Sequence, residues 1–414
     1  MTGDKMNELI KQRIAAVRRG EVPEGYQQIN GYIIPRNWHL EPLSNKFMRS
    51  FRKNDSACDN VLTISAQLGL VSQKEYYDKD IASEDKSGYY LLKKGEFAYN
   101  KSYSTGYPFG AIKRLEKYET GIVSPLYICF TPLKETNASF YAQYFEAGLY
   151  NREIYRFAQE GARNHGLLNI STEDFFAGDL AVPPEEEQRK IAEILSVCDR
   201  IIARKQELVG NLQNLKKACL AKLFPQSGFK VPKLRFPGFT APWEQRKLCD
   251  VTEEFQSGKF IEAADIEEAG EYPVYGGNGL RGYCNKYNHD GDYALIGRQG
   301  ALCGNMNYSC GKAYFTEHAV AVKANAHSNT RFLYYLLEKM NLGQYSDQSA
   351  QPGLAVRKLL KLQNMFPSKP EQDKIGEFLT GLDDTITLHK REIEEEQRKK
   401  NVLMQLLLTG MVRV

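Results

Sequence analysis

The sequence predicts a mixed α/β (α+β) protein built as two similar halves, each with a strand-rich domain and a long helix. Three observations lead to this expectation. A similar sequence typical of a helix start occurs twice, as EEEQRKIAEIL at 185–195 and PEQDKIGEFL at 370–379. Apolar residues follow both starts at heptad spacing. The segment before each helix opens on one of the chain's two tryptophans, Trp38 and Trp243.

The length and charge agree with two domains but do not define a function. A chain of 414 residues is too long for one ordinary core, since single cores stop growing at about 250–300 residues. Lys and Arg number 55 against 51 Asp and Glu, which gives a formal net charge of +4. This balance is compatible with nucleic-acid binding without favouring it, because such binding depends on a local basic patch.

The sequence also predicts a compartment. The N-terminus lacks the apolar region of a signal peptide, and no apolar run approaches the length of a membrane span. The eight cysteines include no Cys-x-x-Cys pair, which is typical of reduced, mostly buried thiols. We therefore expect a cytoplasmic protein without a membrane partner.

Both long helices are predicted to carry an apolar seam. The first is expected over 186–222, and adding 184 to its core positions gives the core positions of the second. The predicted seam residues are Ile191, Leu195, Cys198, Lys205 and Leu212, then Ile375, Leu379, Leu382 and His389, and the wider apolar set of the first helix adds Ile201, Leu208 and Leu215. Lys205 and His389 are the ionisable members of the seam. A layer formed by these two residues can fix the register of the helices and the number of helices that associate, at a cost in stability. Alternatively, both side chains reach solvent from separate surface helices.

The strand-rich domains are predicted at 37–183 and 243–366. Both contain strand-length alternation and many Gly, Tyr and β-branched residues, as in GEFAYNKSY (95–103) and GDYALIGRQG (291–300). A short helix is expected over 330–340, with Asn329 or Thr330 as its N-cap. The remaining boundaries are an N-terminal helix (7–19) and connector at 1–36, the first long helix at 184–226, a linker at 227–242 and the second long helix at 367–414.

Two motifs raise other chemistries. Gly277-x-Gly279-x-x-Gly282 matches a dinucleotide fingerprint, but the following residues are typical of a turn and a strand rather than the required helix. Cys303, Cys310 and His318 offer zinc-ligating atoms at a spacing that fits no common finger, so buried thiols and a lone histidine are favoured. We expect no metal or cofactor in this chain.

Several segments together resemble one family. They are VPKLRFPGFTAPWEQRKL (231–248), YPVYGGNGLRGY (272–283), ALIGRQGALCG (294–304), QSAQPGLAV (348–356) and the paired E-Q-x-K-I helix starts. The chain resembles, over essentially its whole length, the specificity subunits of type I restriction-modification systems. The second half matches the family closely. In the first half the resemblance rests mainly on its frame, the tryptophan segment and the start of the long helix, and on NHGLLNIST (164–172).

The resemblance implies an arrangement and partners. In this family each variable domain is a target recognition domain that reads one half of a bipartite site in double-stranded DNA. The repeated helices pack antiparallel as a coiled coil, with pseudo-two-fold symmetry, and dock two modification (methyltransferase) subunits. Restriction/translocase subunits complete the assembly. The specificity subunit itself is non-catalytic, and S-adenosylmethionine, ATP and Mg belong to its partners.

Candidate DNA-reading residues follow from the chemistry of base edges, which favours guanidinium and amide groups on loops. In the second domain they are Lys259, Tyr275, Asn278, Arg281, Arg298 and Gln299. In the first domain, alignment of 95–110 with 291–300 gives Asn100, Lys101, Ser102 and Tyr103. The rival interpretation is an enzyme, a nuclease or methyltransferase acting alone. A pure coiled-coil scaffold is disfavoured, because it gives no role to two folded domains of unlike sequence.

Overall fold

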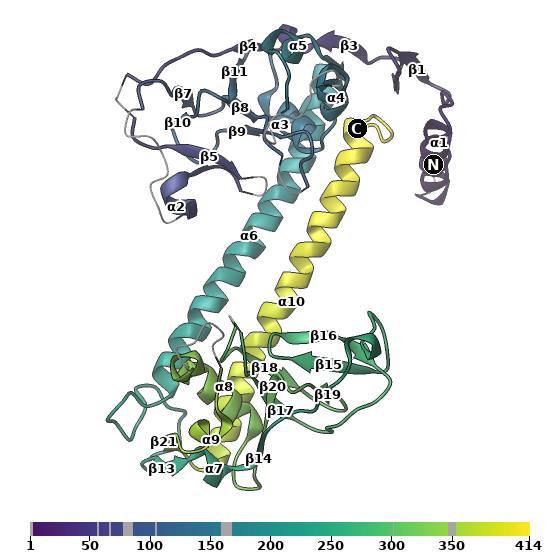
Figure 1. Ribbon diagram of the computed structural model, residues 1–414. Coiled ribbons are helices and arrows are strands. Elements are labelled where there is room, and N and C mark those ends of the chain that lie inside the picture. Colours follow the sequence, from purple (N-terminus) through teal and green to yellow (C-terminus); the bar gives the residue numbers. More distant parts are fainter. Residues whose placement is uncertain are drawn as a thin grey trace. The chain divides into compact units, whose positions relative to one another are not determined.

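The computed structural model describes residues 3–55, 58–65, 68–77, 86–103, 106–158, 168–300, 302–346 and 353–414 (Figure 1). The chain forms two compact units, Met1–Ala203 with Glu394–Val414, and Arg204–Ile393. Two long helices, α6 (Glu185–Leu223) and α10 (Lys369–Leu408), each contribute one part to each unit. Residues 164–167, 301 and 348–352 of the motifs that carry the resemblance lie outside the described residues.

The first unit is organised around a four-stranded antiparallel sheet in the order β4-β11-β8-β9. Its strands are β4 (Phe47–Arg49), β8 (Phe97–Asn100), β9 (Ala111–Arg114) and β11 (Ile128–Pro132). Further pairs are β1 (Tyr26–Ile29) with β2 (Tyr32–Pro35), β3 (His39–Pro42) with β12 (Asp179–Val182), β5 (Leu62–Ser65) with β6 (Gly69–Ser72), and β7 (Tyr90–Lys93) with β10 (Thr120–Val123). The helices are α1 (Gly3–Arg18), η1 (Leu43–Asn45), α2 (Gln73–Tyr77), α3 (Ala138–Glu146), α4 (Asn151–Ala158) and α5 (Thr172–Ala177). Phe47 meets Phe97, Phe130 and Tyr141 edge-on in the core.

The second unit has the same kind of sheet, in the order β14-β20-β17-β18. Its strands are β14 (Thr252–Ser257), β17 (Tyr293–Gly297), β18 (Met306–Ser309) and β20 (Ala319–Ala324), and a smaller sheet joins β16 (Gly279–Cys284), β15 (Tyr272–Gly276) and β19 (Tyr314–Phe315). β13 (Glu244–Lys247) pairs with β21 (Gln363–Phe366), and the helices are α7 (Leu248–Val251), η2 (Ala263–Asp265), α8 (Thr330–Met340), η3 (Leu342–Tyr345) and α9 (Val356–Leu359). Asn329 caps α8, as predicted, because its side chain accepts from Phe332 N at 2.8 Å.

The two units repeat one frame. Strands β4, β11, β8 and β9 correspond in order to β14, β20, β17 and β18, and all neighbours are antiparallel. The strand before each long helix pairs with the strand after each tryptophan: Val182 lies opposite His39, and Phe366 lies opposite Glu244. Both partners are the residue directly after a tryptophan. The frame predicted from the tryptophans is therefore present in both units.

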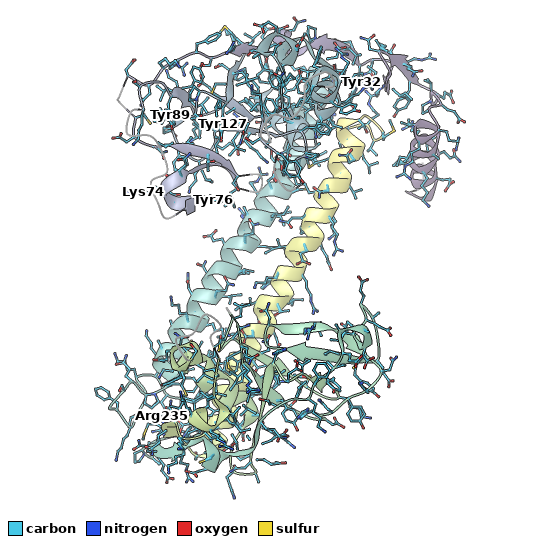
Figure 2. The ribbon with its side chains drawn as sticks, viewed as in Figure 1. Tyr32, Lys74, Tyr76, Tyr89, Tyr127 and Arg235 are labelled. Atoms are coloured by element: carbon cyan, nitrogen blue, oxygen red, sulfur yellow. The ribbon has the colours of Figure 1, made fainter. Side chains whose placement is uncertain are left out.

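The glutamate of the repeated helix start is a buried anchor in the second unit. Glu371 is 1% exposed. Its carboxylate accepts two hydrogen bonds from Arg235, both at 2.7 Å, and one from Trp243 Nε1 at 3.3 Å; Figure 2 labels Arg235. Because a buried carboxylate is costly unless it is paired, the motif requires the arginine and the tryptophan to meet at the start of α10.

The first unit builds the same anchor from a different part of the chain. Glu187 accepts from Trp38 Nε1 at 3.0 Å and from Arg413 at 2.6 and 2.7 Å. Here the arginine belongs to the C-terminal tail after α10, whereas Arg235 belongs to the segment after α6. The two arginines follow their helices by different numbers of residues, so the sequence repeat alone did not pair them.

The glutamine of the same motif closes the turn between strand and helix. Gln188 Nε2 donates to the carbonyl of Pro183 at 2.9 Å, and Gln372 Nε2 donates to that of Pro367 at 2.9 Å. Both glutamines are buried. The repeated Glu-Gln pair therefore specifies the same junction twice: one side chain fixes the tryptophan frame and the other fixes the entry into the helix.

The predicted seam residues all lie on rows of buried and half-buried positions that alternate steps of four and three. The row of α6 is Ile191, Leu195, Cys198, Ile202, Lys205, Val209, Leu212, Lys216, Cys219 and Leu223, and that of α10 is Ile375, Leu379, Leu382, Ile386, His389, Ile393, Glu396, Lys400, Leu403 and Leu407. The wider apolar set needs a correction, because Ile201, Leu208 and Leu215 are 39, 40 and 47% exposed. Each precedes a row position by one residue, which turns it away from the partner helix.

Lys205 and His389 meet on facing helices within the second unit. Lys205 Nζ lies 2.6 Å from Glu392 Oε2, and His389 Nδ1 lies 3.0 Å from the same oxygen. The hydrogen bonds from Lys205, and then from His389, lower the pKa of the Glu392 carboxyl. The two side chains thus share one carboxylate instead of reaching solvent from separate helices.

Replacing both Lys205 and His389 with leucine is expected to raise the melting temperature, because the seam gains apolar burial and Glu392 is exposed enough to lose its partners at little cost. The lowered pKa of Glu392 means that its contribution to wild-type stability is present above the ordinary value of 4.5 and is lost as the pH falls below it. The advantage of the variant should therefore grow in acid. Calorimetry at pH 7 and pH 4 checks this, and a lower melting temperature at pH 7 would contradict it.

Each unit also contains one lysine–aspartate ion pair between α6 and α10. The lysine belongs to α10 in the first unit and to α6 in the second. Lys400 binds Asp199 at 2.5 Å in the first unit, and Lys216 binds Asp383 at 2.9 Å in the second. The pairings within each unit run in opposite directions along α6 and α10, so the helices are antiparallel there. Helices α3 and α8 complete these junctions through Gln143, 2.7 Å from Asp199, and Tyr335, 2.8 Å from Asp383. Each sheet-covering helix is therefore tied to the long helices by a hydrogen bond to the paired aspartate.

Candidate functional site

Three loops of the second unit meet beside its sheets. They are the turn between β15 and β16, the chain after β17, and the connection from β19 to β20. Backbone hydrogen bonds join them: Arg298 N donates to His318 O at 2.9 Å, and Thr316 N donates to Tyr275 O at 2.9 Å. The segments that the sequence offered as separate candidate loops thus form one surface.

Glycines allow these loops to approach so closely. A Cβ on Gly277 would lie 2.9 Å from the carbonyl oxygen of His318, and one on Gly297 would lie 2.3 Å from that of Gly277. Larger residues would force the loops apart. The Gly-rich motif therefore serves loop packing, and it joins strand β15 to strand β16, which agrees with the rejection of the dinucleotide fingerprint.

A β-bulge presents two consecutive side chains to solvent. Val274 lies opposite Gly282, but Tyr275 lies opposite Leu280, so Arg281 is the extra residue of β16. Leu280 and Arg281 are both exposed, whereas a regular strand would turn one of them to the opposite face. The bulge thereby aims the guanidinium of Arg281 outward beside the turn.

A hollow of about 440 Å³ opens between the loops. Its lining residues are Gly277, Asn278, Arg281, Gln299, Leu302 and His318. Three predicted readers, Asn278, Arg281 and Gln299, are thus brought together. No hydrogen bond or ion pair joins their side chains to another residue in the described ranges. One guanidinium and two amides therefore face the hollow with their polar groups available to a ligand.

The other predicted residues of this unit differ in setting. Arg298 is half-buried, and its carbonyl accepts from Leu354 N at 2.9 Å. Lys259 is exposed just after β14, and its backbone N donates to Phe315 O at 2.9 Å. Tyr275 is half-buried with its ring 6.1 Å from that of Phe315, and burial raises its pKa. Tyr275 is therefore mainly a packing residue of the loop, whereas Lys259 is exposed.

The corresponding loop of the first unit follows β8. Asn100 Nδ2 donates to the hydroxyl of Tyr127 at 3.4 Å, and its Oδ1 accepts from Ser102 N at 3.0 Å; Figure 2 labels Tyr127. Lys101 is half-buried and Tyr103 is exposed. The side chain of Asn100 thus braces the loop, and Tyr103 is the predicted reader of this loop whose side chain is exposed.

Leu302 and His318 line the hollow, yet the sequence did not identify them as readers. His318 is partly exposed, with Nε2 3.1 Å from Glu317 Oε1. Within the described ranges no three His, Cys, Asp or Glu side chains form a metal-binding group, and Cys303 instead donates from Sγ to Arg298 O at 3.2 Å. The signal that could have found both residues is their position in connections of the sheet: Leu302 lies between β17 and β18, and His318 lies directly before β20.

This fold and this site define a class of protein with two similar domains, each carrying polar loops at a sheet edge, joined by shared antiparallel helices. The family model of the type I restriction modification DNA specificity domain matches residues 241–396. This range contains the whole hollow. No helix in the described ranges is long and apolar enough to cross a membrane.

Comparisons with individual proteins agree. The type I restriction enzyme EcoprrI specificity subunit of Escherichia coli is 43% identical over 161 residues, 38% of this chain and 39% of that protein; the match thus spans less than half of that relative. The putative type I restriction enzyme MjaX specificity subunit of Methanocaldococcus jannaschii is 24% identical over 92% of this chain and 95% of its own. The crystal structure of the S subunit from M. genitalium shares the fold with a TM-score of 0.61, at 18% identity over 90% of this chain and 96% of its own. The chain is thus similar to type I restriction-modification specificity subunits, in sequence to their DNA specificity domain over residues 241–396 and in fold over most of its length.

Proposed function

We propose that this chain is the non-catalytic DNA-recognition subunit of a type I restriction-modification complex, in which each strand-rich domain reads one half of a bipartite target in double-stranded DNA. The observation that carries the proposal is the repeated frame. Two sheets of the same strand order, tied to the long helices by the same anchors, hold loops of unlike sequence. A constant frame with different loops suits two readers of different half-sites.

The chemistry of the second-unit hollow suits base edges. A guanidinium makes paired hydrogen bonds to guanine O6 and N7, and an amide makes them to adenine N6 and N7. Arg281 supplies the first group, and Asn278 and Gln299 supply the second. Lys259, which is exposed, would contact a phosphate, and such a contact positions the duplex without reading its sequence. In the first unit the corresponding candidates are the exposed Tyr103 and the half-buried Lys101.

The long helices dock two modification subunits in this proposal. Four apolar side chains on α6 are exposed, namely Val197, Ile201, Leu208 and Leu215. Their spacing of four, seven and seven places them on one face of the helix, turned away from the seam row. The restriction/translocase subunits join through the same assembly, and S-adenosylmethionine, ATP and Mg are used by these partners.

The rival function, a nuclease or methyltransferase acting alone, makes a different prediction for the purified chain. We expect the chain alone neither to cut DNA nor to retain labelled S-adenosylmethionine, and DNA methylation to begin only when modification subunits are added. Filter binding with the labelled cofactor and incubation with plasmid DNA test this. Binding of the labelled cofactor, or cleavage of DNA, by the chain alone would contradict the proposal and favour a stand-alone methyltransferase or nuclease.

Replacing Arg298 with alanine is expected to weaken specific DNA binding by about 1–3 kcal/mol, the range of a base-reading arginine. The loss should concentrate on one half of the target. Titration against the specific and a random duplex, with exposed Arg246→Ala as a control, measures it. Equal weakening on both duplexes would make Arg298 a phosphate contact, and no change would remove it from the interface.

A further inference from the structure

The second-unit hollow combines its polar groups with an exposed apolar wall. Leu302 lines the hollow and is 48% exposed, and Leu280, beside Arg281 on the bulge, is 53% exposed. An isolated exposed leucine is ordinary on a protein surface. Here, however, one leucine belongs to the same hollow as Asn278, Arg281 and Gln299, and the other directly adjoins one of those residues in the strand.

The backbone holds both leucines in place without burying them. Around Leu302, Asn305 N donates to Leu302 O at 3.0 Å, and Gly304 N donates to Gly297 O at 2.7 Å. Leu280 lies opposite Tyr275 in the β15–β16 pairing. The side chains are therefore presented at the surface and not packed into a core. Apolar atoms fixed at a polar reading surface point to an apolar feature on the ligand.

Base edges in the major groove offer one such feature, the C5-methyl group of thymine. An A·T pair presents that methyl group beside the N6 and N7 atoms that an amide recognises. Resting on the proposed function, we infer that Leu302 contacts a thymine methyl group in the second half-site, with Leu280 as a second apolar contact on the bulge. The hollow thus reads at least one A·T pair through an amide of Asn278 or Gln299 together with Leu302.

The test removes the methyl group from the DNA and the leucine from the protein. Each thymine of the second half-site is replaced in turn by uracil, which lacks only that methyl group, and the affinity of the full chain is measured by fluorescence anisotropy. At one position uracil should weaken wild-type binding about fourfold, as expected for losing one buried methyl group. Leu302→Ala should weaken binding to the thymine duplex and make it indifferent to uracil at that position. Leu302→Met should retain the preference for thymine.

The outcomes separate this inference from the function on which it rests. Three outcomes would overturn the inference while specific binding persists. Uracil could leave the affinity unchanged within twofold at every position, or the losses from uracil and from Leu302→Ala could simply multiply. The second half-site could also contain no A·T pair. Absence of any specific binding by the wild-type chain would instead overturn the proposed function. Because Leu302 is half exposed, its variants should melt at the same temperature as the wild type. Combining Leu280→Ala with each uracil substitution in the same way tests whether Leu280 contacts a second methyl group.

Discussion

Replacing Glu371 with alanine is expected to lower the free energy of unfolding of the second unit by about 3–5 kcal/mol, the cost of removing one partner from a buried ion pair. The change leaves the guanidinium of Arg235, which is only 14% exposed, without its carboxylate. It also removes the acceptor of the Trp243 N–H. Denaturant titration of the full chain, followed by the fluorescence of its two tryptophans, measures the loss.

Two control variants make this result specific. Glu186→Ala removes a largely exposed carboxylate that pairs with Arg189 one turn along α6, and it should change stability little, because solvent screens such a surface pair. Glu187→Ala removes the equivalent anchor in the first unit and should resemble Glu371→Ala, with a smaller loss because Arg413 is more exposed than Arg235. A Glu371→Ala loss no larger than that of Glu186→Ala would show that the buried carboxylate does not hold the frame.

A chain ending at Ala241 is expected to form a dimer. In the full chain, the C-terminal part of α10 covers the first-unit core, where Met404, Leu407 and Leu408 pack with Ile191 and Leu195. The truncated chain lacks this cover, and exposing such a seam is unfavourable. A second copy can supply it by a two-fold contact, because its own α6 repeats the missing row.

The residues of α6 match those they would replace. Across the repeat, Lys216 takes the place of Lys400 and can bind Asp199 of the other copy, as Lys400 does in the full chain. Leu220, Leu223 and Phe224 likewise take the places of Met404, Leu407 and Leu408. Arg235 is retained and can bind Glu187 in place of Arg413, which this truncation removes.

Light scattering and methylation mapping together measure the outcome. We expect a dimer that, with modification subunits, methylates a symmetric target made of the first half-site twice. The same truncation with Arg235→Ala should dissociate at higher protein concentration, because the buried Glu187 then lacks a cation. A soluble monomer, or a dimer that still needs the original asymmetric target, would show that the repeated frame lacks functional symmetry.

The parts of the fold that could be predicted from the sequence are those with local signals. Heptad spacing placed the first long helix at 186–222, within one residue of α6 at either end. The two tryptophans and the repeated helix start located the strand pairs that frame each domain. The cap of α8 was readable because an asparagine before an apolar helix has one common role.

Other features depend on contacts that the sequence does not align. Arg235 and Arg413 each bind the buried glutamate at the start of a long helix, but they follow α6 and α10 by different numbers of residues. The equivalence of the two arginines is therefore visible only in the structure. Ile201 and Ile202 are equally apolar, and only the partner helix decides which one is buried. The bulge at Arg281 adds one residue to a strand that otherwise looks regular, and it decides that Leu280 and Arg281 share a face. Leu302 and His318 reach the hollow through loop packing alone.

The central claim, that each domain reads its own half of a bipartite target, is tested most directly by mapping methylated positions in DNA modified with the wild-type chain and with a variant carrying Asn278→Ala and Arg281→Ala. The wild type should give two short specific sequences separated by a nonspecific gap. The variant should accept additional bases in one of the two sequences and leave the other unchanged. A single continuous target for the wild type, or a variant that relaxes both halves or neither, would contradict the claim.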